Sequence, residues 1–239
     1  MKRTEKLARG ALELGICLSE SQLEQFEQYY EMLIETNKVM NLTGITQWED
    51  VVDKHFIDSL CVARAVRFKE GDKVIDMGTG AGFPGIPLKI AFPDIQITLM
   101  DSLNKRIGFL KNVLLELGLL KAEAVHARAE DLARDLGYRE QYDYCFSRAV
   151  ANMSTLSEYC LPFVKVGGKF IPYKSGNIDE ELTNSQNAIT RLGGKISRVD
   201  QYTLMGTDAG RSLIIVDKIR PTGKAYPRKA GKPSREPLS

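Results

Sequence analysis

The residues with the clearest chemical potential are an aspartate and the glycines that follow it. Asp76 lies near the end of a short apolar run. Gly78, Gly80 and Gly82 come next, at alternating positions. Because glycine has no Cβ, such a turn lets a ligand reach backbone N–H groups at the start of a helix. Pro84 suits the first position of that helix, so the run predicts a strand, a ligand-binding turn and a helix.

Two classes of ligand fit this turn. Residues 80–85 satisfy the G-x-G-x-x-G pattern of dinucleotide-binding enzymes, which would make the protein an NAD(P)-dependent oxidoreductase. Asp76 disfavours that ligand, because its carboxylate would repel a pyrophosphate and attract a cationic amino group. S-adenosylmethionine carries an ammonium group, a sulfonium and no phosphate. The turn therefore favours S-adenosylmethionine as the cofactor, with the dinucleotide as the alternative.

Other polar residues follow predicted strands and belong to the same edge of the sheet. In open α/β sheets, ligands bind at the carboxyl ends of the strands. Asp101 ends the second predicted strand, roughly 20 residues after the first glycine, where a carboxylate would accept two hydrogen bonds from a ribose diol. Glu130 follows the third predicted strand and Arg148 follows the fourth. Together these residues predict a nucleoside-cofactor site.

The spacing of apolar residues predicts the elements that position this site. Residues 1–70 are predicted to be helical, with a capping box at Ser19 and Gln22 and a second helix over about 49–66. From residue 73 onward, alternating strand and helix patterns predict a parallel sheet. The predicted strands are 73–77, 96–100, 123–126, 142–146, 169–173, 195–204 and 212–219, and the predicted helices are 84–91, 102–117 (capped by Ser102), 152–163 and 179–192. No helix separates the last two strands, so we expect them to form an antiparallel pair at one edge.

Composition limits the class of protein. The chain has 239 residues, of which 43% are hydrophobic, so it can bury a sizeable core. Its four cysteines show no C-x-x-C spacing, which argues against a zinc site and a disulfide framework. No apolar run reaches the roughly 18 residues of a membrane span, and the N-terminus lacks the apolar core of a signal peptide. These features predict a cytoplasmic protein with no metal and no membrane partner.

Charge is unevenly distributed along the chain. The net charge is only +2, yet residues 218–239 are rich in Lys and Arg, and Glu236 is their only acidic residue. Such a basic, proline-containing tail suits a phosphate-rich partner. A solvated, poorly ordered terminus would have the same composition. The charge pattern alone leaves both interpretations open.

Two features that some methyl-transferring enzymes use are missing from the predicted site. Enzymes that methylate exocyclic amines commonly carry an Asn/Asp-Pro-Pro-aromatic turn after the fourth strand, but residues 147–150 here are Ser-Arg-Ala-Val. Methylation at pyrimidine C5 needs a cysteine nucleophile, but Cys145 and Cys160 fall inside predicted core elements. The N7 atom of guanine requires neither device, because its lone pair carries no proton and alignment with the sulfonium supplies most of the rate.

Several motifs, taken together, resemble one family. The matching stretches are 40–43, 55–60, 76–84, 101–106, 128–130, 147–151 and 226–229. They extend over nearly the whole chain and resemble the glucose-inhibited division protein B family, the small-subunit rRNA guanine-N7 methyltransferases called RsmG. The resemblance implies an α/β fold of the class I S-adenosylmethionine-dependent methyltransferases, with a Rossmann-like, mostly parallel seven-stranded sheet and an N-terminal helical extension. It also implies that the target is a guanosine in the 530 loop of 16S rRNA.

The resemblance also implies roles for single residues. Gly78, Phe83, Ala129, Glu130 and Arg148 match positions that contact the cofactor in that family. We expect Ala129 and Glu130 to bracket the adenine, and Phe83 to pack near the methionine portion. Arg148 is expected at the point of methyl transfer, where it would position the cofactor, the guanine or a phosphate. No general base is required there.

The remaining site residues are assigned by charge and position. Asp76 is expected to bind the methionine ammonium group, directly or through water, while Gly80 and Gly82 permit close backbone approach. His55 is expected to be packed or hydrogen-bonded rather than catalytic. The candidates for RNA contact are Lys105, Arg106, Lys174, Arg211, Arg228 and Lys229. The sequence divides into a helical segment (1–70), a methyltransferase domain (71–219) and a basic tail (220–239).

Partners and rival functions follow from the same features. The expected partner is 16S rRNA, the small ribosomal subunit or its precursor, bound by a monomeric protein. A catalytically idle protein that binds rRNA through its tail is one rival. A methyltransferase that acts on a small molecule or a protein is another, and the basic tail disfavours it.

Overall fold

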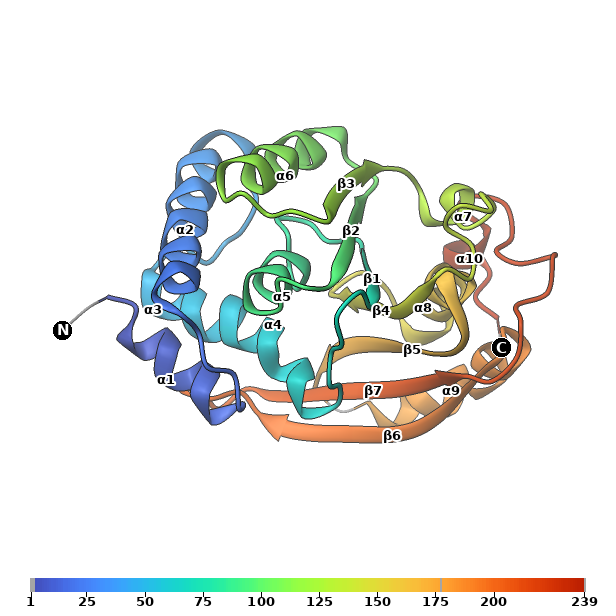
Figure 1. Cartoon of the computed structure of the whole chain (residues 1–239). Coiled ribbons are helices and arrows are strands. Elements are labelled where there is room, and N and C mark those ends of the chain that lie inside the picture. The colour runs from blue at the N-terminus through green and yellow to red at the C-terminus, as the bar shows by residue number, and fades with distance from the viewer. Residues whose placement is uncertain (1–2, 177, 239) are drawn as a thin grey trace.

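A computed structural model describes residues 3–176 and 178–238. Its strands form one seven-stranded sheet with the order β3-β2-β1-β4-β5-β7-β6 (Figure 1). The strands are β1 (Lys73–Met77), β2 (Gln96–Asp101), β3 (Ala122–His126), β4 (Tyr142–Arg148), β5 (Val164–Ser175), β6 (Gly194–Thr203) and β7 (Gly210–Lys218). The strand order reverses between β1 and β4, which is where ligands bind in sheets of this type.

Most neighbouring strands run in parallel. β1 pairs in parallel with β2 and with β4, and parallel pairs also join β2 to β3 and β4 to β5. β7 runs antiparallel to both β5 and β6. The prediction of a mostly parallel α/β sheet with an antiparallel pair at one edge is therefore confirmed.

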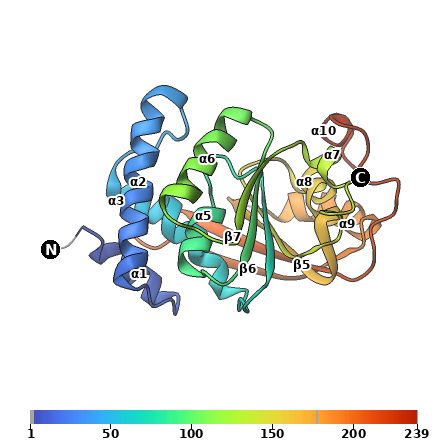
Figure 2. The same cartoon turned by 45° about the horizontal axis from the view of Figure 1, so that its top comes forward.

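Helices cover both faces of the sheet. The α-helices are α1 (Glu5–Glu13), α2 (Glu20–Met40), α3 (Trp48–Val51), α4 (Asp58–Leu60), α5 (Gly85–Ala91), α6 (Asn104–Glu116), α7 (Ala129–Leu132), α8 (Met153–Cys160), α9 (Asp179–Arg191) and α10 (Lys232–Arg235). A π-helical segment η1 (Val52–Ile57) and two 3₁₀ segments, η2 (Cys61–Arg64) and η3 (Leu161–Phe163), complete the set. Figure 2 shows α1, α2, α5 and α6 on one side of the sheet and α7–α10 on the other.

The period-2 alternation of the strands produces two hydrophobic clusters. Val74 and Phe146 point into the cluster that contains the buried residues of α1–α6. Their chain neighbours Ile75 and Cys145 point into the other cluster, which contains buried residues of α7–α9. Because successive side chains of a strand face opposite ways, strands covered on both faces must be apolar at consecutive positions. The site at the strand ends therefore rests on a sheet that is packed on both sides.

The N-terminal helices are part of this core. Phe26, Tyr29 and Leu33 of α2 are fully buried in the cluster that also contains Leu88 of α5. The predicted capping box is confirmed, because the backbone N–H of Gln22 donates to Ser19 Oγ at 3.2 Å and the Ser19 N–H donates to Gln22 Oε1 at 2.8 Å. In the described part of the chain, no helix combines the length and apolar character that crossing a membrane requires.

Several predicted helices differ in detail, and two of the differences concern the site. The predicted cap at Ser102 is wrong: α6 begins at Asn104, and the Asp101 carboxylate accepts the Leu103 N–H at 2.9 Å. The predicted helix over 49–66 forms, but its winding changes from α to π and then to 3₁₀. A π-helical turn fits one extra residue and is frequent at functional sites. This turn carries His55, which lies at the site described next.

Candidate active site

The glycine turn is held open by backbone hydrogen bonds to its neighbour strand. Gly78 and Gly80 have φ values of +71° and +63°, which other residues rarely adopt. The N–H groups of Gly78 and Thr79 both donate to the Met100 carbonyl, at 2.9 and 3.0 Å. A Cβ added to Gly80 would meet no described atom within 4 Å, so open space lies beside it. The turn therefore leaves room for a ligand at the point where the strand order reverses.

Asp76 is buried beneath this turn. Its Oδ2 accepts the Thr79 hydroxyl at 2.6 Å and the Gly85 N–H at 2.8 Å, and both bonds fix the turn. Its Oδ1 is buried and has no hydrogen-bond partner among the described residues. Burial raises the pKa of the Asp76 carboxyl to about 6, against the opposing effect of those two hydrogen bonds. One oxygen thus has a structural role, and the other is an unsatisfied acceptor for a cationic or N–H group.

Asp101 lies at the end of β2 with its side chain almost fully buried. Its Oδ2 accepts the Gly80 N–H at 3.0 Å and lies 3.3 Å from Arg106 Nη1, and its Oδ1 accepts the Leu103 N–H. A carboxylate has about four acceptor positions, so three are already used. The expectation of two further bonds from a ribose diol therefore requires Arg106 to move away. Arg106, a candidate for RNA contact, pairs with the site carboxylate in this structure.

A first cavity of about 530 Å³ opens at the carboxyl ends of β1 and β2. It brings together four of the residues predicted to bind cofactor, from three different segments: Gly78, Asp101, Ala129 and Glu130. Its other lining residues are Met77, Met100, Ser102, Arg106, Ala127, Arg128, Ala149, Val150, Tyr159, Gly231 and Ser234. Asp76, Gly80, Gly82, Phe83 and Arg148, which are also predicted to bind cofactor, are not among the described residues that line it. The first cavity therefore contains the residues predicted to bind the adenosine part of the cofactor.

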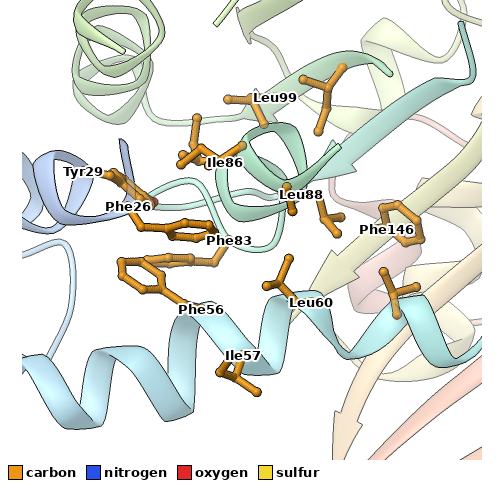
Figure 3. Packing of buried hydrophobic residues seen from close by; sticks show 14 of the residues in the cluster. Phe26, Tyr29, Phe56, Ile57, Leu60, Phe83, Ile86, Leu88, Leu99 and Phe146 are labelled. Atoms are coloured by element: carbon orange, nitrogen blue, oxygen red, sulfur yellow. The ribbon is translucent and has the colours of Figure 1, made fainter. Parts of the chain in front are cut away.

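Aromatic side chains hold the turn from behind. The Tyr29 hydroxyl donates to the Ala81 carbonyl at 2.6 Å, so α2 is hydrogen-bonded directly to the turn. The Phe83 ring lies against Tyr29 and Phe56, with ring centroids 5.5 and 6.2 Å away (Figure 3). The His55 ring stacks on Phe83 with a centroid distance of 4.4 Å. The helices before residue 70 therefore support the site through an aromatic cluster.

Arg148 lies at the end of β4, where His55 and Asp58 approach it from the helical run. Its Nη1 donates to Asp58 Oδ2 at 2.7 Å, and its Nη2 lies 3.3 Å from His55 Nδ1. The other ring nitrogen of His55, Nε2, lies 2.8 Å from Thr43 Oγ1. Burial, followed by the charge of Arg148, lowers the pKa of His55 to about 3. His55 is therefore a neutral, hydrogen-bonded ring that contacts the guanidinium.

A second cavity, of about 620 Å³, adjoins the first and shares Ala149 and Val150 with it. Its cationic lining residues come from the helical run and from β4, β5 and β7, and they are Lys54, Arg148, Lys174 and Arg211. Its carboxylates are Asp58 and Glu181. Arg211 Nε donates to Asp58 Oδ1 at 3.2 Å, and Lys174 Nζ donates to Glu181 Oε1 at 2.7 Å. The second cavity therefore has an excess of positive charge.

The remaining RNA candidates lie outside the cavities. Lys105 and Lys229 are exposed to solvent. Arg228 is not free for a partner, because its Nε and Nη2 donate to the fully buried Glu158 carboxylate at 2.9 and 2.7 Å. Of the two interpretations of the basic tail, the solvated, poorly ordered terminus is wrong: the described part of the C-terminal segment packs against α8. Composition could not show this, because the buried partner Glu158 lies in a distant helix.

Comparison with known proteins identifies the family. The profile of rRNA small subunit methyltransferase G (GidB) matches residues 22–206. The chain is 52% identical over 238 residues to the ribosomal RNA small subunit methyltransferase G of Lachnoclostridium phytofermentans, covering 100% of this chain and 98% of that protein. It is 51% identical over 232 residues to the protein of the same name from Alkaliphilus metalliredigens, covering 97% of each. The chain belongs to the rRNA small subunit methyltransferase G family.

Solved structures of lower identity share the fold. A SAM-dependent methyltransferase from Aquifex aeolicus has a TM-score of 0.52 at 17% identity, covering 70% of this chain and 92% of that chain. TrmN from Thermus thermophilus has a TM-score of 0.53 at 15% identity, covering 70% of this chain and 53% of that chain. At these identities the likeness shows the fold alone. This methyltransferase G family member has the class I methyltransferase fold.

The partners of Arg148 could not be predicted from the sequence. Asp58 and His55 are three residues apart, which places them on the same side of one helical run. That spacing was visible within the 55–60 motif, but nothing in the sequence showed that the run crosses the end of β4. Glu158 and Gly231 were missed for the same reason, because their contacts join distant segments of this methyltransferase G family chain.

Proposed function

We propose that this protein transfers a methyl group from S-adenosylmethionine to N7 of a guanosine in the 530 loop of 16S rRNA. The observation that carries the proposal is the pair of adjoining cavities that share Ala149 and Val150. The first has the carboxylates that a nucleoside cofactor needs, and the second has the positive charge that a nucleotide needs. Membership of the methyltransferase G family supports the same assignment.

The residues around the first cavity fit the cofactor. Asp101 would hold its ribose once Arg106 moves away, and Glu130 and the N–H of Ala129 at the start of α7 would bracket its adenine. The unsatisfied Oδ1 of Asp76 suits a direct or water-mediated bond from its ammonium group. When bound, S-adenosylmethionine supplies an electrophilic methyl group on a sulfonium. The protein contributes position and negative charge around that cation.

The second cavity fits an RNA nucleotide. Its volume lies within the range of about 300–1,000 Å³ that is usual for small-molecule sites. Four cationic side chains face two carboxylates there, so the net charge favours a phosphate-bearing ligand. A guanine must leave its stack for N7 to approach the methyl group in line. Arg148, fixed by Asp58, would position that guanine or its phosphate beside the shared residues Ala149 and Val150.

Methyl transfer to N7 requires few chemical groups from the protein, and the site is consistent with that. N7 carries no proton, so transfer needs alignment and no general base. Cys145 and Cys160 are fully buried, and no cysteine is among the described residues that line the second cavity. Burial raises the pKa of Cys61 to about 12, which keeps this thiol protonated. The arrangement therefore lacks the thiolate that methylation of a pyrimidine carbon would require.

The form of the RNA substrate, the oligomeric state and the cellular location complete the proposed function. We propose that the substrate is the assembled small subunit or its precursor rather than free guanosine, with the exposed cations Lys105 and Lys229 contacting phosphates. The protein would act as a cytoplasmic monomer. Sedimentation equilibrium of the full chain checks the oligomeric state.

Transfer of a radiolabelled methyl group tests the proposed reaction. The acceptors are small ribosomal subunits that lack the modification, naked 16S rRNA and tRNA, and borohydride–aniline cleavage maps 7-methylguanosine in the product. Label confined to one guanosine of the 530 loop is the expected result. Label at another base, or in tRNA, would refute the proposed acceptor. Failure to bind S-adenosylmethionine would refute the proposed donor.

A further inference from the structure

Residues 226–238, which we call the C-terminal strap, form part of the wall of the first cavity. Gly231 and Ser234 line that cavity together with residues of the sheet edge. Figures 1 and 2 show α10, which begins one residue after Gly231, beside α7 and α8. The family profile ends at residue 206, before the strap begins.

The strap touches a residue of the proposed cofactor site directly. The N–H of Gly231 donates to Glu130 Oε1 at 2.8 Å. Gly231 has a φ of +78°, a conformation that favours glycine and that turns the chain into α10 at this point. Glu130 is buried, so this hydrogen bond fixes one oxygen of its carboxylate. The orientation of Glu130 therefore depends on where the strap lies.

A buried ion pair anchors the strap three residues before Gly231. Arg228 binds Glu158 through its backbone N–H at 2.7 Å, and its guanidinium binds both carboxylate oxygens. The Glu158 side chain is fully buried, and that of Arg228 is 19% exposed. A bidentate Arg–carboxylate pair is geometrically specific, and a buried carboxylate without its partner is strongly unfavourable. Arg228 is therefore held in one place.

Two further contacts fix the strap on the other side of Gly231. The Thr155 hydroxyl donates to the Pro233 carbonyl at 3.0 Å. Leu238 is buried in the same hydrophobic cluster as the residues of α8 and α9. Thr155 and Glu158 are three residues apart on α8, so one face of this helix holds both ends of the Gly231 turn.

We infer that the strap is a positioning element for the cofactor: Arg228 and Glu158 clamp it so that Gly231 and Ser234 complete the adenosine end of the first cavity. The inference rests on the proposed use of that cavity by S-adenosylmethionine. It replaces an RNA-binding role for Arg228 with an internal one. Arg228 and Glu158 are positioning residues, since they act through Gly231 and Glu130.

The variant Arg228→Ala tests the inference by calorimetry with S-adenosylhomocysteine. We expect the dissociation constant to rise by about fivefold or more, the lower end of typical coupling between sites. Arg228→Lys, which keeps the charge, should restore part of the affinity. Lys224→Ala removes an exposed positive charge that lies just before the strap, and should leave the affinity unchanged. The KM for small subunits and its dependence on salt should change equally little in all three variants.

An RNA-binding role for Arg228 predicts a different result. If Arg228 contacts RNA, Arg228→Ala raises the KM for small subunits, flattens its salt dependence and leaves cofactor affinity intact, which overturns the inference. Wild-type protein that binds no S-adenosylhomocysteine overturns the proposed function itself.

Hydrogen exchange on the wild-type protein tests the positioning role of the strap even if Arg228→Ala fails to fold. The Gly231 amide should exchange more slowly when S-adenosylhomocysteine binds, because the cofactor and the strap share Glu130. Protection at residues 129–130 without any change at Gly231 would overturn the inference while leaving the proposed cofactor site intact.

Discussion

Arg148 Nη1 lies 2.7 Å from Asp58 Oδ2, and this buried pair joins the end of β4 to the helical run that precedes the sheet. The Asp58 side chain is only 4% exposed and also accepts a bond from Arg211. One carboxylate therefore fixes two of the cations that line the second cavity. The helical extension thus shapes the proposed acceptor site as well as the hydrophobic core.

The first prediction concerns Asp58→Asn. Loss of the charge leaves Arg148 without its ionic partner, so we expect the free energy of unfolding to fall by about 3 kcal/mol or more. Methyl transfer should fall because Arg148 is no longer held in place. Denaturant unfolding and single-turnover transfer measure the two effects. The matched control is Asp50→Asn, which removes an exposed carboxylate paired with Lys54. Equal effects of the two substitutions would contradict the role given to Asp58.

The second prediction concerns the open space beside Gly80. In Gly80→Ala the new Cβ meets nothing in the described residues, but the φ of +63° is strained for alanine by about 1–2 kcal/mol. Gly71→Ala has the same open surroundings and a φ of +80°, at the opposite end of β1. Both variants should lose similar stability. Only Gly80→Ala should bind S-adenosylhomocysteine more weakly, by about tenfold, in calorimetry. Equal affinities would show that no ligand approaches this turn.

The third prediction concerns Asp76, whose pKa is raised by burial from 3.8 to about 6. The folded protein therefore holds this proton more tightly than the unfolded chain does. The resulting stability is fully present below about pH 4 and is lost as pH rises through about 6. Asp76→Asn keeps the acceptor for Thr79 and Gly85 and does not titrate. The stability of the wild type relative to this variant should therefore fall across that window.

Cofactor affinity should change in the opposite direction over the same window. The ionised Asp76 attracts the ammonium group, so binding of S-adenosylhomocysteine to the wild type should strengthen from about pH 5 to pH 7. Asp76→Asn should bind weakly at every pH. Calorimetry across this range provides the measurement. A wild-type affinity that tracks that of the variant would rule out contact between Asp76 and the ammonium group.

The sequence predicted the elements of the fold better than the contacts between them. The period-2 and helical patterns located all seven strands, and the strand-end rule placed Asp101 and Glu130 at one cavity. The pattern could not show that Arg228 belongs inside the protein, because the Glu158 that neutralises it lies 70 residues away. It also could not show that Arg106 pairs with Asp101. The sequence shows the sign of each charged side chain. Whether that side chain is buried depends on which distant segments of the chain pack together.

The last prediction concerns the ionisation of His55. Its pKa is lowered to about 3, first by burial and then by the adjacent charge of Arg148, so the ring should stay neutral between pH 5 and pH 8. Because the unfolded chain binds this proton near pH 6.5, the contribution of His55 to stability is present above that pH and is lost as pH falls toward 3. The chain has two histidines, so NMR of the His126→Gln variant isolates the ring protons of His55. Their chemical shifts should not change from pH 8 to pH 5, and Arg148→Ala should move the midpoint upward. A midpoint near 6.5 in the His126→Gln protein would mean that His55 is exposed and does not contact Arg148.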